Sequence, residues 1–188
     1  MIDVNQSRSL MQEWVESDSL RVHMEAVAVC MRAYAQQQAP AEVDRWVIAG
    51  LLHDFDYERH PTAAEHPFVG VACLRERGDV DEEIIEAILG HADYSGVART
   101  TPMAKTLFAV DELAGFIVAC CKVRPRGIGD LTTKSVKKKL KDVRFAAAVS
   151  REDIQQGIKE LSVDSDDHIQ ICIDALRVDG ERLGLVRD

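Results

Sequence analysis

Apolar residues recur at intervals of three and four along almost the whole chain, the spacing that gathers them on one face of an α-helix. Strand signals are nearly absent: the one Asp-Gly pair, Asp179-Gly180, lies in a polar tail and not between two alternating apolar runs. Capping residues and prolines divide the helical pattern into segments. We expect helices that begin near residues 17, 42, 67, 81, 102, 132, 150 and 166. The sequence therefore predicts an all-α fold, a compact bundle of many helices.

The composition is that of a globular protein. The chain has 188 residues, of which 46% are hydrophobic and 29% charged, and no repeat or low-complexity segment divides it. We expect one domain over residues 1–188. The formal net charge of -9 argues against an extended nucleic-acid surface and against binding to anionic lipid.

The cysteines and the apolar stretches indicate the compartment. Five cysteines are scattered without a CxxC pair, as in proteins that keep their thiols reduced. The first residues lack the basic and apolar regions of a signal peptide. The longest apolar stretches, such as 113–121, are too short to cross a bilayer. We expect a cytoplasmic protein without a membrane partner.

Four histidines fall on or at the ends of expected helices, each among apolar or small residues. They are His23, His53, His66 and His91. Asp54 follows His53 directly, and adjacent helical side chains diverge by about 100°. Both can therefore reach one ion only beyond a helix terminus or where the last turn relaxes. Imidazole with carboxylate is a ligand set for Zn, Fe or Mn and not for Ca. His60 and His168 fit no part of this pattern, and we expect them at the surface.

The stretch Gly50-Leu51-Leu52-His53-Asp54 resembles the signature of the HD superfamily of metal-dependent phosphohydrolases, in the subgroup called HDIG. Other motifs of that family flank it in the family's order. They are Val22-His23, His66-Pro67-Phe68-Val69-Gly70, Ile88-Leu89-Gly90-His91 and Ala109-Val110-Asp111-Glu112-Leu113. The resemblance covers about residues 20–125. It implies an HD core there and a C-terminal helical extension over about 126–180.

The resemblance also implies a divalent metal ion, which could be Mn, Fe, Zn, Mg or Co. It assigns the core metal site to His23, His53, Asp54 and Asp111. In family members with two ions, the residue matching Asp54 bridges them, and those matching His66 and His91 bind the second. The chain departs from this pattern at Ala92, where many members have a further histidine, and at Phe55-Asp56-Tyr57, where the motif often continues Ile-Gly. The site could therefore hold one ion or two. If it holds one, His66 and His91 would instead contact the residues that bind the ion, or the substrate.

The chain shows no serine or cysteine nucleophile constellation and no Walker-type glycine loop. Hydrolysis by metal-activated water is then the simplest chemistry, with Asp54 and His53 as catalytic residues. Asp54, Asp56 or Glu65 could deprotonate or orient the water. We expect a small anionic phosphate ester, nucleotide-like, as the substrate. The alternatives are a di-iron oxygenase on the same fold and a non-catalytic, nucleotide-binding regulatory HD domain.

One segment is basic in an otherwise acidic chain. Residues 122–144 hold nine lysines and arginines against Asp130 and Asp142. Such a run is commonly a solvated helix face. The alternative is that part of it lines the site entrance and attracts an anionic substrate. On that alternative the substrate-binding candidates are Arg124, Arg126, Lys134 and Lys137.

Overall fold

The computed structural model describes residues 1–187, which fold into α-helices without a β-sheet. The helices are α1 (Val4–Trp14), α2 (Asp18–Gln38), α3 (Val43–Leu52), α4 (Phe68–Arg77), α5 (Glu82–Gly90), α6 (Pro102–Lys122), α7 (Thr133–Leu140), α8 (Arg151–Leu161) and α9 (Ser165–Val178). Three single turns of 3-10 helix join them: η1 (Pro40–Glu42), η2 (Asp93–Ser95) and η3 (Ile128–Asp130). The all-α prediction is confirmed.

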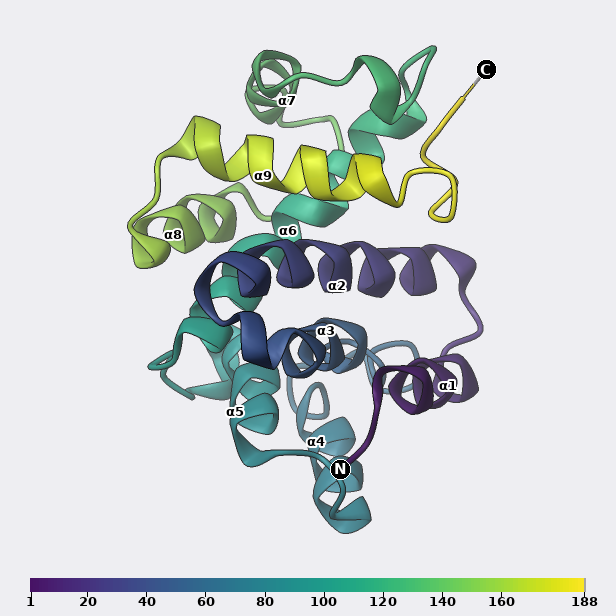
Figure 1. Ribbon diagram of the computed structural model, residues 1–188, viewed down its shortest axis with the longest axis vertical. Coiled ribbons are helices and arrows are strands. Elements are labelled where there is room, and N and C mark those ends of the chain that lie inside the picture. Colours follow the sequence, from purple (N-terminus) through teal and green to yellow (C-terminus); the bar gives the residue numbers. More distant parts are fainter. Residues whose placement is uncertain (188) are drawn as a thin grey trace.

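The long helix α2 crosses the middle of the molecule (Figure 1). It packs against α3 on one side and α9 on the other, and it also contacts α6. The helix α7 lies at one end of the molecule and α4 at the opposite end (Figure 1). Side chains of α8 and α9, including Ile154, Ile169 and Leu176, belong to the same hydrophobic core as those of α2 to α6. No helix within residues 1–187 is long and apolar enough to cross a membrane.

The expected helix starts are confirmed to within one residue, because the capping residues act as expected. Ser17 accepts a hydrogen bond from the backbone of Leu20 at the start of α2, and Ser150 caps α8 in the same way. At the start of α7, Thr132 and Ser135 form a reciprocal capping box.

The helix α1 was not expected from the sequence. This helix begins with a capping box between Asp3 and Gln6, and its buried Leu10 and Met11 face the core. Ion pairs hold it to distant parts of the chain: Glu25 on α2 pairs both with Arg8 of α1 and with Arg182 of the C-terminal segment. The first and last segments are thus tied to the same helix.

Two close helix contacts fix the helices that surround the site. At Gly50 of α3, a Cβ atom would lie 2.6 Å from the Cα of Ala28 in α2. At Gly157 of α8, a Cβ atom would lie 2.5 Å from the Cα of Ala109 in α6. Each glycine therefore lets two helix backbones approach more closely than any side chain would allow.

The expectation that His168 lies at the surface is wrong. Its side chain is completely buried in α9, where Nε2 donates to the carbonyl of Ala109 and Nδ1 accepts from the Tyr34 hydroxyl. These two partners satisfy both ring nitrogens, so burial costs little. The pKa of His168 is lowered because burial disfavours the charged ring. His60 is partly exposed in the loop before α4.

We expect Gly157→Ala to destabilise the protein by about 1–3 kcal/mol, although alanine is the better helix former. The added methyl would meet backbone atoms of α6, which cannot move aside without disturbing the core. Denaturant unfolding monitored by circular dichroism measures the change. Gly129→Ala is the matched control, because a Cβ atom there meets only Arg126 Cβ, at 3.8 Å. Unfolding midpoints for Gly157→Ala equal to those of the wild type would contradict the close packing.

Candidate metal centre

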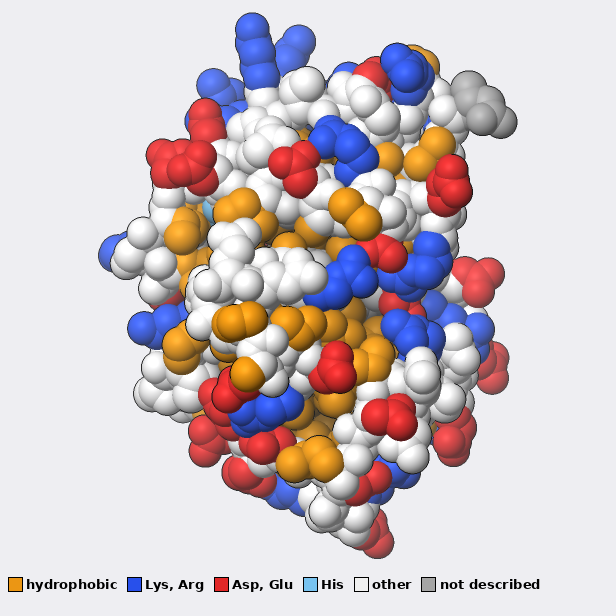
Figure 2. Space-filling model, viewed as in Figure 1, with side chains coloured by type: hydrophobic (Ala, Val, Ile, Leu, Met, Phe, Trp, Pro, Cys, Tyr) orange, Lys and Arg blue, Asp and Glu red, His pale blue; other side chains and the backbone are white. Residues whose placement is uncertain are grey.

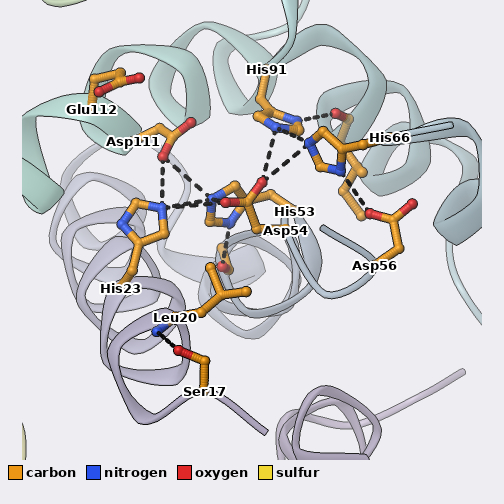
Figure 3. Close-up of polar contacts among 12 residues, drawn as sticks. Ser17, Leu20, His23, His53, Asp54, Asp56, His66, His91, Asp111 and Glu112 are labelled. Carbon is orange, nitrogen blue, oxygen red and sulfur yellow. Dashed lines mark hydrogen bonds and ion pairs between the residues drawn. The ribbon is translucent and has the colours of Figure 1, made fainter. Parts of the chain in front are cut away.

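Six side chains from five segments converge below one surface pocket (Figure 3). His23 comes from α2, and Asp111 comes from α6. His53 and Asp54 directly follow α3, His66 precedes α4, and His91 directly follows α5. His53 and Asp54 lie beyond the end of the helix, which is the geometry that lets neighbouring residues face one point.

The first group of ligand atoms is formed by His23, His53 and the two aspartates. Nε2 of His23 lies 3.2 Å from Nε2 of His53. Oδ1 of Asp111 lies 3.0 Å from Nε2 of His23 and 3.3 Å from Nε2 of His53. Oδ2 of Asp54 lies 3.7 Å from both. The ligand atoms of His23, His53 and Asp54 therefore lie within 4.8 Å of one another, and Asp111 lies beside the two imidazole nitrogens.

The second group is formed by His66, His91 and the other oxygen of Asp54. Oδ1 of Asp54 lies 3.2 Å from Nε2 of His66 and 3.3 Å from Nε2 of His91. The two nitrogens lie 3.2 Å apart. Asp54 thus offers one oxygen to each group. The second group forms although residue 92 is alanine.

Hydrogen bonds on the far side of three rings fix how those rings are turned. Nδ1 of His53 bonds to the carbonyl of Gly50, and Nδ1 of His91 bonds to the carbonyl of Ile88. Because a carbonyl only accepts, each Nδ1 must carry a proton. Each neutral ring then presents an unprotonated Nε2 to the centre.

Asp56 fixes the ring of His66 in the same way, and the sequence analysis missed this role. Its Oδ1 accepts from Nδ1 of His66 at 2.7 Å, and its Oδ2 accepts from the backbone of Gly70 at 2.7 Å. Asp56 is buried and does not line the pocket, so among the three carboxylates considered for orienting a water only Asp54 faces the cavity. The partners of Asp56 lie ten and fourteen residues along the chain, and no spacing rule pairs them. Glu65 is bonded to Thr62 outside the pocket.

The cluster concentrates negative charge in a buried place. Burial alone would lower the pKa of His53, but the charges of Asp54 and Asp111 outweigh this effect and raise it to about 9. Burial opposes ionisation of the two aspartates as well, yet the charge of His53 holds the pKa of both below its usual range. The aspartates therefore stay ionised and require positive charge beside them.

The donor set fits divalent metal ions. Pairs of imidazole nitrogens with their lone pairs 3.2 Å apart repel each other unless a proton or a cation lies between them. Three ligand atoms from His23, His53 and Asp54 lie within 4.8 Å of one another, and so do three from Asp54, His66 and His91. Mixed imidazole and carboxylate ligands suit Zn, Fe, Mn or Co.

A cavity of about 400 Å³ lies over the cluster. Its walls are aromatic at Tyr57, Tyr94 and Phe108 and acidic at Glu112 and Asp153. Burial, followed by the charge of Asp111, raises the pKa of Glu112 to about 7. Further wall residues are Ala92, Asp93, Gly115 and Val149. Val149 and Asp153 belong to the C-terminal extension, so the pocket includes residues outside the expected core of 20–125.

The structure does not bring the four basic candidates to this pocket. Arg124 bonds to the side chain and the carbonyl of Asp130, and Lys137 pairs with Asp166 of α9. Neither Arg126 nor Lys134 lines the cavity. The basic residues come after the end of α6, and α6 continues for eleven residues beyond Asp111, a rise of about 16 Å away from the metal centre. Figure 2 shows lysine and arginine side chains gathered over α7, at the end of the molecule.

Comparison with known proteins shows the family to which the chain belongs. A sequence model of the HD domain matches residues 20–115, which is slightly more than half of the chain. The chain belongs to the HD domain family, a superfamily of metal-dependent phosphohydrolases. The match is to the HD domain as a whole and does not single out the HDIG subgroup. Searches among curated proteins and among solved structures gave no match.

We expect Asp56→Asn to weaken metal binding at the group that contains His66. Asparagine cannot accept both the ring proton of His66 and the backbone proton of Gly70 as a carboxylate does. Loss of a carboxylate that orients a ligand histidine lowers metal affinity by about 10–100-fold. Competition with a metal-binding dye measures the affinity. Asp174→Asn, on the exposed face of α9, is the control and should bind as the wild type does. Unchanged affinity in Asp56→Asn would contradict the role of Asp56.

Proposed function

We propose that this protein hydrolyses a small phosphate monoester with the help of divalent metal ions. His23, His53, Asp54 and Asp111 would hold one ion, and Asp54, His66 and His91 would hold a second. The observation that carries the proposal is that the two carboxylate oxygens of Asp54 face two separate groups of imidazole nitrogens. A carboxylate placed in this way is suited to bridge two ions.

A divalent ion in this position would lower the pKa of a coordinated water and neutralise charge on a phosphoryl group. The reaction forms a bond between the water oxygen and phosphorus. It breaks the phosphorus–oxygen bond to the organic group and releases an alcohol and inorganic phosphate. Asp54 and Asp111, which stay ionised at neutral pH, would hold the cations that supply this positive charge. Asp54 and His53 are the residues to which we assign the catalytic role.

The pocket supports a small substrate. Its volume of about 400 Å³ is at the lower end of the range for small-molecule sites. No lysine or arginine lines it within residues 1–187. Additional phosphate groups would therefore have no cation other than the ions to meet. A nucleotide-like substrate stays a prediction, and under this proposal it would be a monophosphate.

Oxidative cleavage is the second candidate, because each group offers two imidazoles and an oxygen of Asp54, a ligand set that would also suit iron. An anaerobic assay separates the two functions. Hydrolysis continues without oxygen, and oxygenation stops. The metal content of freshly purified protein adds to this test, since two equivalents of iron would favour the oxygenase.

We expect Asp54→Ala to lose bound metal and to lower kcat/KM for any accepted phosphate ester by at least about 100-fold. The reason is that this substitution removes an oxygen from both ligand groups at once. Elemental analysis and phosphate release measure the two effects. Removal of metal from the wild type by a chelator should abolish activity, and added Mn²⁺ should restore it. Retention of both metal and activity in Asp54→Ala would contradict the proposal, and Asp174→Asn serves again as the control.

A further inference from the structure

One wall of the pocket carries two carboxylates that the metal centre does not use. Glu112 follows Asp111 on α6, yet its carboxylate points away from the imidazoles (Figure 3). Its Oε2 accepts a hydrogen bond from the backbone of Ser150 at 3.0 Å. Asp153 lies in the first turn of α8 and lines the same cavity. Within the described part of the chain, the Asp153 carboxylate has no hydrogen bond or ion pair.

No lysine or arginine within residues 1–187 lines the pocket beside these two carboxylates. The remaining acidic residue of the lining outside the metal centre, Asp93, pairs with Arg99 at 2.6 Å. Arg99 itself is not part of the lining, and its guanidinium is also held by Glu160. Two divalent ions would be balanced by the ligand aspartates and by a phosphate monoester dianion. Glu112 and Asp153 are therefore left for the part of the substrate that does not touch the ions.

The aromatic residues of the lining suit the same kind of partner. Tyr57 is 44% exposed and Tyr94 is 53% exposed, so both rings are accessible at the pocket. The Tyr57 ring stands edge to face with His66, with centroids 5.1 Å apart, and so lies directly beside the metal centre. Aromatic faces attract organic cations through the electron density of the ring. Carboxylates and aromatic rings in one small cavity are a recognisable setting for an ammonium group.

We infer that the organic part of the substrate carries a positively charged ammonium group, recognised by Asp153 and Glu112 together with the tyrosines. This inference rests on the proposed function, because it places the phosphate at the ions. The substrate class is a phosphate ester of a small amino alcohol. Asp153 is a specificity-determining residue that comes from the C-terminal extension and not from the matched HD domain.

The experiment measures binding, so that it does not depend on turnover. The Mn²⁺-loaded protein is titrated by calorimetry with four phosphonates of similar length: 3-aminopropyl-, 3-hydroxypropyl-, butyl- and 3-carboxypropylphosphonate. The phosphorus–carbon bond of these compounds is not hydrolysed by a phosphate-ester hydrolase. We expect the amino compound to bind at least about 10-fold more tightly than the butyl compound, with the carboxylate weakest. Equal or tighter binding of the butyl, hydroxyl or carboxyl compound would overturn the inference, as would no binding of any of the four.

Variants locate the preference on the wall. Asp153→Asn and Glu112→Gln should each reduce the preference for the amino compound to less than about 3-fold, with bound Mn²⁺ measured in each protein. Glu152→Gln is the matched control, because Glu152 is the exposed neighbour of Asp153 and does not line the pocket. It should keep the full preference. A preference that survives in both wall variants would overturn the inference.

The two proposals fail in different ways. If the wild type prefers the amino compound but releases phosphate from no ester, the hydrolase proposal is wrong and the recognition of an ammonium group stands. If the wild type hydrolyses phosphate esters without preferring the amino compound, the hydrolase proposal stands and the recognition of an ammonium group is wrong.

Discussion

Two ionised carboxylates that lie mostly buried among imidazoles are the constraint on which the rest of this structure depends. Asp54 and Asp111 are held in the charged state by their surroundings, and an isolated buried charge is costly. Without metal, protons on His53 and His66 balance this charge, which is why the pKa of each rises to about 9. Divalent ions would meet the same need at neutral pH. The raised pKa values and the fit for metal are therefore two expressions of one electrostatic demand.

That demand can be met only if the helices hold the donor atoms at fixed separations. The contact at Gly50 brings α3 against α2, and His23 lies on α2 while His53 follows α3. The rings themselves are then turned by bonds to Gly50, Ile88 and Asp56. None of these bonds lies inside the pocket. Much of the precision of the site therefore comes from residues that a substrate never touches.

The sequence was sufficient for the elements that depend on local chemistry. Helix starts follow from caps and prolines, and the six residues that the structure brings together each stand in a recognisable motif. The helix α1 was missed because its apolar residues are few, although its capping box between Asp3 and Gln6 was visible. Short polar helices give a weak periodic signal even where tertiary ion pairs hold them in place.

Interactions between residues far apart in the chain could not be predicted from the sequence. His168 was expected at the surface because it fits no part of the histidine pattern, and only the fold supplies Tyr34 and Ala109 as partners. The alternative in which basic residues after α6 line the site entrance is not borne out by the pocket lining, because α6 continues for eleven residues beyond Asp111 before these residues begin. In both cases, closeness along the chain was a poor guide to closeness in space.

The pocket wall formed by Val149 and Asp153 has a consequence for how such a protein can diversify. The proposed ion ligands all lie between residues 23 and 111, whereas this wall lies beyond the matched domain. Because Gly157 lets α8 pack directly against the helix that carries Asp111, this wall is held beside the metal centre. Substitutions in a single turn of α8 could therefore change which small molecules bind as substrates while the reaction stays the same.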